Sequence, residues 1–408
     1  MAITLVIFVV SYAAIALGSL PGFRLDRTGV ALVGAIALIA TGGISMDAAW
    51  QSVSFATMAL LFALMVVSAT FGATGFYMHV AKSVASLKTK PAALLAAFIL
   101  TAAVLSAVFT NDVVVLAMTP LLIEITLSRG LNPVPFLLAF CFAANNGSAA
   151  TLIGSPQNML IGNGLDLTFP AFLQINALPA ILSLGFIWLV MALLYRRRWT
   201  LPADKARPAA EPAVPLDRPE TVKALVVTLV LLAAFLFTDW PHPVVALVAA
   251  GAMLTSRRIA SSDILGRIDG SLLLLFFGLF IINRALAETG VPTLLVEELR
   301  HAGLDIRAPL PLFVAISLIS DIVGNSPAVM MVLPYVRQTG VEGTAAALTL
   351  GSAFSSNVVV FGSLAGIIVT EEARKRGIVI SPREFMRAGV PVSLGSMALA
   401  AAWILLRP

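Results

Sequence analysis

The chain has 408 residues, of which 59% are hydrophobic and only 12% are charged. Soluble proteins carry about 25% charged residues, and this much apolar surface cannot be hidden inside a water-soluble particle. The composition therefore excludes a soluble enzyme, a disordered chain and a nucleic-acid-binding domain, and it predicts an integral membrane protein. We interpret the formal net charge of +5 as an excess of lysine and arginine in cytoplasmic loops.

Twelve apolar segments follow one another along the chain. The first lacks the basic region that opens a signal peptide, so we expect it to remain as a membrane helix. Because about 20 residues cross a membrane, the lengths predict an all-α polytopic membrane protein with about ten transmembrane helices plus two re-entrant hairpins with broken helices. The segments are 1–20, 29–42, 53–80, 91–127, 134–163, 171–195, 221–238, 243–255, 271–289, 309–336, 343–370 and 389–406.

Two halves of the chain share a pattern. SAVFTNDVVVLAMTP (106–120) and SDIVGNSPAVMMVLP (320–334) match in Ser, Asn and Pro at a constant offset of 214, and TLIGSPQN (151–158) parallels VVFGSLAG (359–366) at an offset of 208. The proline- and arginine-rich stretch 196–220 separates them as a predicted cytoplasmic linker. We therefore predict two repeats: 1–195, with hairpin 91–127 and broken helix 134–163, and 221–408, with hairpin 309–336 and broken helix 343–370.

The lysine and arginine distribution predicts the topology. Segment 91–127 is about twice the length of one crossing, and Lys88, Lys90 and Arg129 flank it, so both ends are expected in the cytoplasm. Following the chain in both directions from this hairpin, one crossing at a time, places the N-terminus outside and the linker inside. The second hairpin opens to the outside, which makes the two repeats inverted. On this trace 21 of 26 Lys and Arg are cytoplasmic, and the exceptions are Arg284, Arg300, Arg307, Arg337 and Arg407.

Four clusters of small polar residues interrupt the apolar segments and predict the binding site. Backbone groups freed at a helix break cannot face lipid, so they must line a polar cavity or hold an ion. Helix N-termini also attract anions without any Lys or Arg. The predicted substrate- and ion-binding residues are Thr110, Asn111, Asp112, Asn145, Asn146, Gly147, Ser148, Thr151, Ser155, Asn158, Gly324, Asn325, Ser326, Ser355, Ser356, Asn357 and Ser363.

Asp112 stands out among the ionisable residues because it is predicted at the tip of the first hairpin, too far from either end to reach the membrane surface. It is expected to be a cation ligand or proton carrier, and the alternative is a helix N-cap. Asp321, just before the second tip, is a further candidate. A Na⁺ ion is one predicted ligand, held by Asn111, Asp112 and Asn325. No other cofactor is expected.

Other polar and small residues have a structural interpretation. Gly162, Gly366 and Ser396 are isolated and are expected to serve close helix packing. Arg284 is expected to pair with Glu288 one turn later.

Enzyme motifs are absent from the sequence. GxSxG, HExxH and the Walker GK[ST] motif do not occur, and the single cysteine, Cys141, and three scattered histidines form no metal-ligand pattern. We predict that the protein is not an enzyme.

The polar motifs FTNDVVVLAMTP, NNGSAATLIGSPQNMLIG, SDIVGNSPAVMMVLP and FGSLAGIIVTEEARKRG resemble the ion transporter superfamily over nearly the whole chain. That superfamily includes citrate-transporter-like permeases, ArsB-type arsenite permeases, NhaD-type sodium/proton antiporters and divalent-anion/sodium symporters. The resemblance implies two hairpins with Asn-containing tips, here Thr110-Asn111-Asp112 and Gly324-Asn325-Ser326. It also implies an elevator motion against a scaffold built from 29–80 and 221–289, in a homodimer.

These observations predict a secondary active transporter of a small anion, a di- or tricarboxylate or an oxyanion of the arsenite type, coupled to a Na⁺ or H⁺ gradient. The alternative is a Na⁺/H⁺ antiporter of the NhaD type, in which Asp112 and Asp321 bind the cation alone. A membrane-embedded enzyme or a passive channel is the rival from another class. The expected partners are a small anion, membrane lipid and a second copy of the chain, with no nucleic acid, in a bacterial inner membrane.

Overall fold

The computed structural model describes residues 1–18, 22–201, 215–336 and 340–406, and these residues are almost entirely helical, without a β-strand among them. The helices of the first half are α1 (Ala2–Leu17), α2 (Arg27–Ala40), α3 (Met46–Ser52), α4 (Phe55–Ala73), α5 (Phe76–Ala85), α6 (Pro91–Val108), α7 (Asn111–Ser128), α8 (Pro133–Ser148), α9 (Pro156–Gly164) and α10 (Phe169–Tyr195).

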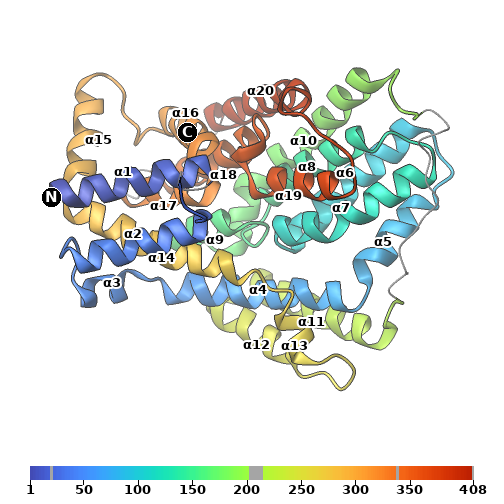
Figure 1. Ribbon diagram of the computed structural model, residues 1–408, viewed down its shortest axis with the longest axis horizontal. Helices are drawn as coiled ribbons and strands as arrows, with labels where there is room; N and C mark the ends of the chain where they lie inside the picture. The colour runs from blue at the N-terminus through green and yellow to red at the C-terminus, as the bar shows by residue number, and fades with distance from the viewer. Residues whose placement is uncertain (19–21, 202–214, 337–339, 407–408) are drawn as a thin grey trace.

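The second half follows with α11 (Arg218–Phe237), α12 (His242–Leu254), α13 (Ser261–Leu265), α14 (Gly270–Glu288), α15 (Val291–His301), α16 (Pro309–Val323), α17 (Asn325–Val336), α18 (Val341–Ser355), the 3₁₀ turn η2 (Val360–Gly362), α19 (Leu364–Lys375) and α20 (Pro382–Leu406). Figure 1 shows all of these along the colour gradient.

Seven of the described helices are long and apolar enough to cross a membrane, namely α4, α6, α7, α10, α11, α14 and α20. The apolar helices α1, α2, α12 and α16 are shorter. Many of their outward side chains are large and hydrophobic, which suits a lipid environment. The predicted fold class, an all-α polytopic membrane protein, is confirmed, and the number of ten crossings stays a prediction.

The helices of the two halves follow the same order. α4 and α14 each have 19 residues, and a short helix precedes each of them. After one further helix, α5 or α15, comes a broken pair, α6–α7 or α16–α17. A second broken pair, α8–α9 or α18–α19, and a long helix, α10 or α20, complete each half. This order agrees with the predicted repeat, whereas the inverted orientation of the halves stays a prediction.

The predicted linker 196–220 is only partly described, because residues 202–214 lie outside the described ranges. One correction applies at its end. α11 begins at Arg218, where Asp217 caps the helix by accepting a hydrogen bond from the backbone N–H of Glu220. Residues 218–220 are therefore helical, since an aspartate cap followed by proline at the first turn starts a helix efficiently.

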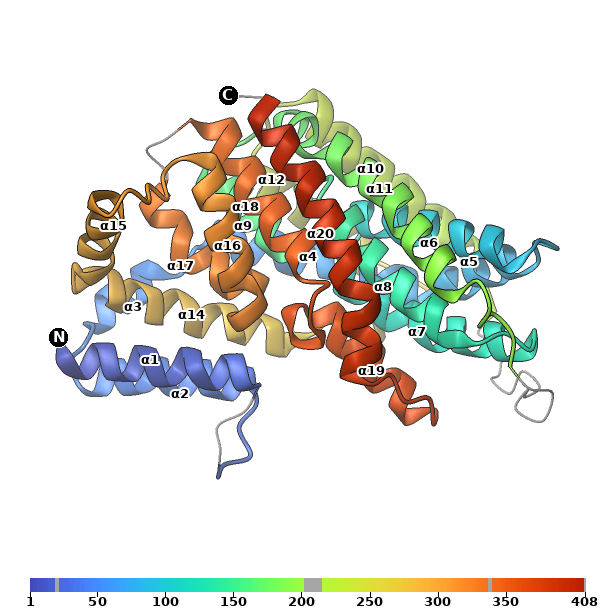
Figure 2. The same cartoon turned by 90° about the horizontal axis from the view of Figure 1, so that it is seen from above.

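Two groups of helices build the molecule. In one, α2 packs against α14, α4 against α12, and α1 against both α2 and α14. In the other, the broken pairs pack against α10 and α20. Figure 2 shows α1 and α2 side by side along one edge, with α10 and α20 as long helices of the other group.

The two halves interlock at the centre. The second arm of each hairpin packs against the second segment of the other half's broken helix, so that α7 contacts α19 and α17 contacts α9. All four of these helices begin at a break in an apolar segment. Packing therefore gathers four helix starts from both halves of the chain into one central region.

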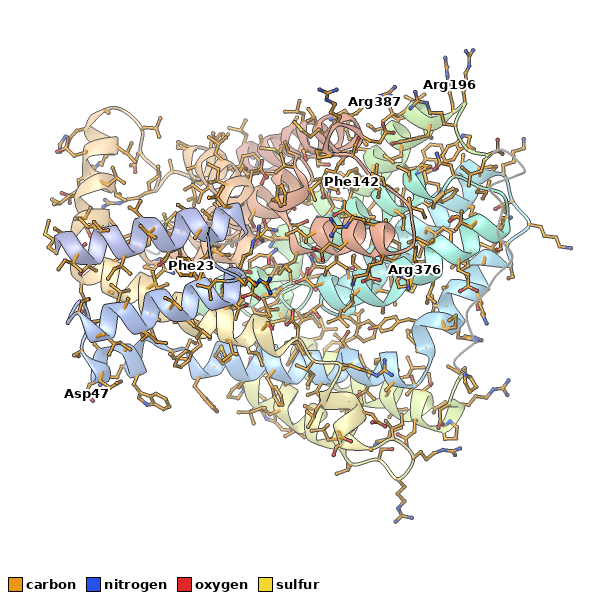
Figure 3. The ribbon with its side chains drawn as sticks, viewed as in Figure 1. Phe23, Asp47, Phe142, Arg196, Arg376 and Arg387 are labelled. Carbon is orange, nitrogen blue, oxygen red and sulfur yellow. The ribbon has the colours of Figure 1, made fainter. Side chains whose placement is uncertain are left out.

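Three arginines from distant parts of the sequence lie in the same half of the molecule. Figure 3 shows Arg196, Arg376 and Arg387 in the half of the molecule away from Asp47. The sequence assigned these three arginines to the cytoplasmic side. Their shared half agrees with that assignment, and the orientation in a membrane stays a prediction.

Candidate functional site

The tip of the first hairpin is a two-residue break. α6 ends at Val108, Phe109 is extended, and Thr110 precedes α7 as its N-cap position. The backbone N–H of Asn111 donates to the carbonyl of Gly154 at 3.0 Å, which ties this tip to the break that follows α8. Asp112 lies in the first turn of α7, so the N-cap alternative for it is wrong. A carboxylate there interacts favourably with the positive end of the helix.

The tip of the second hairpin turns on a single glycine. α16 ends at Val323, α17 begins at Asn325, and Gly324 between them has φ 92° and ψ 158°. Only glycine adopts this combination readily, because a Cβ atom would clash with its own backbone. The sharp turn brings the first residues of α17 back toward the centre of the molecule.

Replacing Gly324 with alanine is expected to distort this tip. A Cβ atom would find room, since its nearest neighbours are Pro327 Cδ at 3.8 Å and Arg27 Nη1 at 4.0 Å. The cost is therefore backbone strain, about 1–3 kcal/mol for a residue held in a sparsely populated region. Transport activity should fall markedly while the protein still folds. Flux into proteoliposomes, with thermal unfolding in detergent as the control, checks this, and a fully active Gly324→Ala variant would contradict it.

Side chains close the break between α8 and α9. Asn158 donates through Nδ2 to the carbonyls of Ser148 at 2.9 Å and Thr151 at 2.8 Å. The Thr151 hydroxyl donates to the carbonyl of Ala107 at 2.5 Å, in the first hairpin. These contacts satisfy backbone oxygens that the break leaves free. Asn158 and Thr151 therefore hold the shape of the break.

Asn325 performs the corresponding task in the second half. With its amide nitrogen placed toward the two carbonyls that it faces, Asn325 donates to Gly362 and Ser352, each at 3.1 Å. Ser363 then caps α19 by accepting a hydrogen bond from the backbone N–H of Gly366 at 3.0 Å. The second hairpin tip is thus fastened to the second break, as the first tip is to the first break.

A chain of four buried amides connects the two halves. Asn111 donates to Asn145 Oδ1 at 3.2 Å, and Asn145 donates in turn to Asn357 Oδ1 at 2.9 Å and Ser363 Oγ at 3.0 Å. Asn357 donates to Asn146 Oδ1 at 2.8 Å. None of the four asparagines is more than 4% exposed. Buried amides are stable only when their hydrogen bonds are made, so this chain fixes the first tip and both breaks in one arrangement.

The amide chain ends on two long helices. Asn146 donates to Ser183 of α10 at 3.0 Å and to Ser396 of α20 at 3.1 Å. The interpretation of Ser396 as a packing residue is therefore incomplete, because its hydroxyl accepts a hydrogen bond. Gly162 and Gly366 do serve packing, since an added Cβ would press against Leu152 and the carbonyl of Val360.

A cavity of about 540 Å³ lies where the two hairpin tips meet. Within the hairpins and broken helices, the initial residues of four helices line it, from α7, α9, α17 and α19. The polar lining residues from these helix starts are Asn111, Asp112, Gln157, Asn325, Ser326 and Ser363. Because a helix N-terminus carries about half a positive charge, the four together favour an anion in this space.

The first helical group supplies the other wall. Ile15 and Leu17 come from α1, Arg27 lies at the start of α2, and Leu272 and Leu275 come from α14. The cavity therefore lies at the boundary between the two groups of helices.

The charges around the cavity are mixed. Its acidic lining residues are Asp26, Asp112, Asp269 and Glu371. Asp26 and Asp269 cap α2 and α14 by accepting hydrogen bonds from the backbone N–H groups of Gly29 at 2.8 Å and Leu272 at 3.2 Å. Asp112 lies at the tip itself and forms no ion pair within the described ranges. Asp112 is thus the carboxylate best placed to exchange partners.

Glu371 and its neighbour Glu372 differ in their surroundings. Glu372 accepts hydrogen bonds from Lys375 and Arg376, each at 2.7 Å, near the end of α19. Burial by itself would raise the pKa of Glu372, but these hydrogen bonds outweigh it and hold the pKa below its usual value. Glu372 is therefore a paired carboxylate, while Glu371 lines the cavity.

Of the predicted site residues, six line the cavity: Asn111, Asp112, Gly324, Asn325, Ser326 and Ser363. The others are buried and do not line it, although they lie at the breaks or in the amide chain. These are Thr110, Asn145, Asn146, Gly147, Ser148, Thr151, Ser155, Asn158, Ser355, Ser356 and Asn357.

Sequence reasoning missed several lining residues. Asp26, Arg27, Asp269 and Glu371 lie at helix ends, where charged residues ordinarily mark a loop. The one sequence feature that could have revealed any of them is that Arg27 and Asp269 lie beside long apolar segments. Asp321, by contrast, does not line the cavity, and its Oδ1 lies 3.2 Å from the Cβ position of Gly362. The predicted pair of Arg284 and Glu288 is confirmed at 2.9 Å.

The first tip also presents oxygen atoms suited to a small cation. Ser106 Oγ, Thr110 Oγ1 and Asn111 Oδ1 are buried and have no hydrogen-bond partner among the described residues. Asp112 adds a carboxylate beside them. The described ranges contain no group of three or more His, Cys, Asp or Glu residues that could hold a metal ion. A set of mostly neutral oxygens suits a weakly bound monovalent cation better than a tightly held divalent metal.

Comparison with known proteins decides the family. The model of the citrate transporter family, CitMHS, matches residues 5–354 of the chain. The chain belongs to the citrate transporter family. The resemblance to the ion transporter superfamily is thereby confirmed, and this member of the citrate transporter family is a transporter rather than an enzyme.

Individual relatives extend over nearly the full length of this citrate transporter family member. It is 30% identical to the uncharacterized transporter Rv2685 of Mycobacterium tuberculosis, with 99% of this chain and 98% of that protein covered. It is 27% identical to the silicon efflux transporter LSI3 of Oryza sativa, with 88% of this chain and 87% of that protein covered. The crystal structure of the YdaH transporter of Alcanivorax borkumensis matches with a TM-score of 0.58 at 14% identity, covering 99% and 96%, and shows a shared fold.

Proposed function

We propose that this protein is a secondary active transporter of a small anion, a carboxylate or an oxyanion, coupled to a Na⁺ or H⁺ gradient. The single observation that supports it most is the cavity of about 540 Å³ lined by both hairpin tips and by the starts of four helices. A volume of this size suits a small molecule. Four positive helix ends attract a negative charge without any lysine side chain. The family description, citrate transporter, also names an anion.

Asp112 is the group proposed to couple the two fluxes. It shares the cavity with the substrate position, and the unpartnered oxygens of Ser106, Thr110 and Asn111 lie in the same hairpin tip. A Na⁺ ion bound there, or a proton on Asp112, would offset the carboxylate charge and so permit an anion to bind nearby. Binding of the cation and of the anion would then favour each other.

An elevator motion fits the arrangement of the two helix groups. The cavity lies at their boundary, and the amide chain fastens the first hairpin and the broken helices to α10 and α20. Asn325 fastens the second hairpin to the second break. These parts would move as one body past α1, α2, α4, α12 and α14. A homodimer in a bacterial inner membrane, with the N-terminus outside and the linker cytoplasmic, completes the proposal.

The test is flux into proteoliposomes that hold the purified protein, with imposed Na⁺ or pH gradients and a panel of carboxylates and inorganic oxyanions. One anion should accumulate against its gradient, and only when the cation gradient is present. Asp112→Asn should reduce accumulation to the level of passive equilibration, because an amide can neither carry a proton nor neutralise a cation. Asp47→Asn, which changes an exposed aspartate in α3, is the matched control and should accumulate normally.

The four carboxyl groups around the cavity favour one alternative, a Na⁺/H⁺ antiporter. It predicts Na⁺-dependent proton movement with no anion present. That result would overturn the anion proposal. Anion flux that survives Asp112→Asn with the same dependence on the gradient would leave the transport proposal standing and remove the coupling role from Asp112.

A further inference from the structure

Arg27 occupies a position that helix stability does not explain. It is the first residue of α2, directly after the N-cap residue Asp26. The N-terminus of a helix carries partial positive charge, so a cation there is unfavourable by a few tenths of a kcal/mol to about 1 kcal/mol. The guanidinium group therefore needs another interaction.

The guanidinium lacks that interaction within the described residues. Its Nε and Nη2 atoms are buried and have no hydrogen-bond partner among them. The adjacent Asp26 accepts from the backbone N–H of Gly29, and none of the four acidic lining residues forms an ion pair with Arg27 in the described ranges. A buried charged donor without a partner is costly, so a site of this kind favours an incoming acceptor.

Arg27 lies on the cavity, close to the second hairpin tip. Arg27 lines the cavity and is the one basic residue among the described residues that do. Its Nη1 atom is 4.0 Å from the position that a Cβ on Gly324 would take. Since Asn325 and Ser326 line the same cavity, a ligand beside Arg27 also meets the positive end of α17.

We propose that Arg27 binds the oxyanion group of the transported substrate, with Nε and Nη2 donating to two oxygens on one carbon or other central atom. This assignment rests on the proposed anion transport and names the residue and the chemistry that recognise the anion. Nε and Nη2 form one edge of a planar guanidinium, which matches a carboxylate or a mononuclear oxyanion with two parallel hydrogen bonds. The start of α17 contacts the ligand from the opposite side.

This geometry also places the ligand between the two helix groups. Arg27 belongs to α2, which packs against α14, whereas Gly324–Ser326 belong to the second hairpin. An oxyanion held by both would bridge the boundary between the groups. Removing Arg27 would therefore weaken substrate binding itself, whereas removal of a loop charge would not.

The test combines binding and transport in the full-length protein. Anion-dependent thermal stabilisation of the detergent-solubilised protein measures binding without any gradient, and uptake into proteoliposomes gives KM and kcat. Two ligand sets are compared, organic carboxylates and inorganic oxyanions. The comparison shows which of the two classes supplies the oxyanion group that Arg27 binds. The variants are Arg27→Gln, Arg27→Lys and, as matched control, Arg24→Gln, which removes an exposed arginine three residues earlier.

Arg27→Gln should abolish the anion-dependent stabilisation and raise KM by at least about 30-fold, the loss expected when one partner of a buried charge pair is removed. Arg27→Lys should raise KM by less, since it keeps the charge but loses the two-pronged edge. Arg24→Gln should match the wild type. Equal melting temperatures without ligand show that the Arg27 variants fold.

Two outcomes overturn the proposal in distinguishable ways. If the wild type binds and transports an anion and Arg27→Gln keeps its KM within twofold, Arg27 is not the anion contact and the proposed function stands. If the wild type neither binds nor transports any anion of either set, the proposed function fails and the role of Arg27 fails with it.

Discussion

Replacing Asn145 with alanine is expected to abolish transport and to lower the melting temperature of the protein substantially. Asn145 accepts from Asn111 and donates to Asn357 and Ser363, and it is 1% exposed. Its removal leaves Asn111 Nδ2 and Asn357 Oδ1 without their partner and takes one of two hydrogen bonds from Ser363 Oγ, and each buried group without a partner costs about 1–3 kcal/mol. The same amide joins the first hairpin tip to the second break, so its loss also separates the two sides of the cavity.

The measurements are the thermal unfolding midpoint in detergent and flux into proteoliposomes. Asn163→Ala is the matched control, because it also removes an asparagine whose amide donates to hydroxyl groups, those of Ser54 and Thr57, but at an exposed position. The control should stay close to the wild type in both measurements. If Asn145→Ala and Asn163→Ala behave alike, the amide chain does not hold the site together.

Replacing Gly389 with alanine is expected to be the most damaging glycine substitution in α20. A Cβ atom at this position would collide with the backbone carbonyl oxygen of Asn357. The obstacle is backbone, which cannot turn aside as a flexible side chain can, so either α20 or the break after α18 must shift. Overpacking of this kind costs about 1–3 kcal/mol and occasionally more. Asn357 also belongs to the amide chain, so the shift would disturb the cavity.

Gly185→Ala in α10 gives the matched control for Gly389→Ala. A Cβ atom at Gly185 would meet nothing within 4 Å, and alanine is the better helix former by up to about 1 kcal/mol. The two substitutions should therefore move the melting temperature in opposite directions, with Gly389→Ala also losing activity. A neutral Gly389→Ala variant would show that α20 does not approach the break as closely as described.

Much of the local structure could be predicted from the sequence. The breaks at Thr110-Asn111 and at Gly324 can be located in the sequence because small polar residues interrupt apolar segments there. The backbone groups that such a break leaves free cannot face lipid. The pairing of Arg284 with Glu288 was equally accessible, since residues four apart lie on one face of a helix. Each of these features depends on neighbours within a few residues.

The same reasoning failed where partners come from distant segments. Ser396 was interpreted as a packing residue, yet it accepts a hydrogen bond from Asn146, 250 residues away in sequence. Arg27 was counted among the loop charges, yet it lines the cavity with Gly324. A single serine or arginine has the same local context in either role. Its role depends on which helix faces it, and the sequence does not state that.

The sequence by itself determined that this chain is an integral membrane protein, that its helices break at Asn-containing tips and that its two halves share one pattern. Those properties follow from hydropathy and from the cost of an unpaired backbone group, both of which act locally. The tertiary structure alone decided that four helix starts, one arginine and one tip aspartate share a cavity. That arrangement arises from the packing of α7 against α19 and α9 against α17, contacts between residues that only the folded chain brings together.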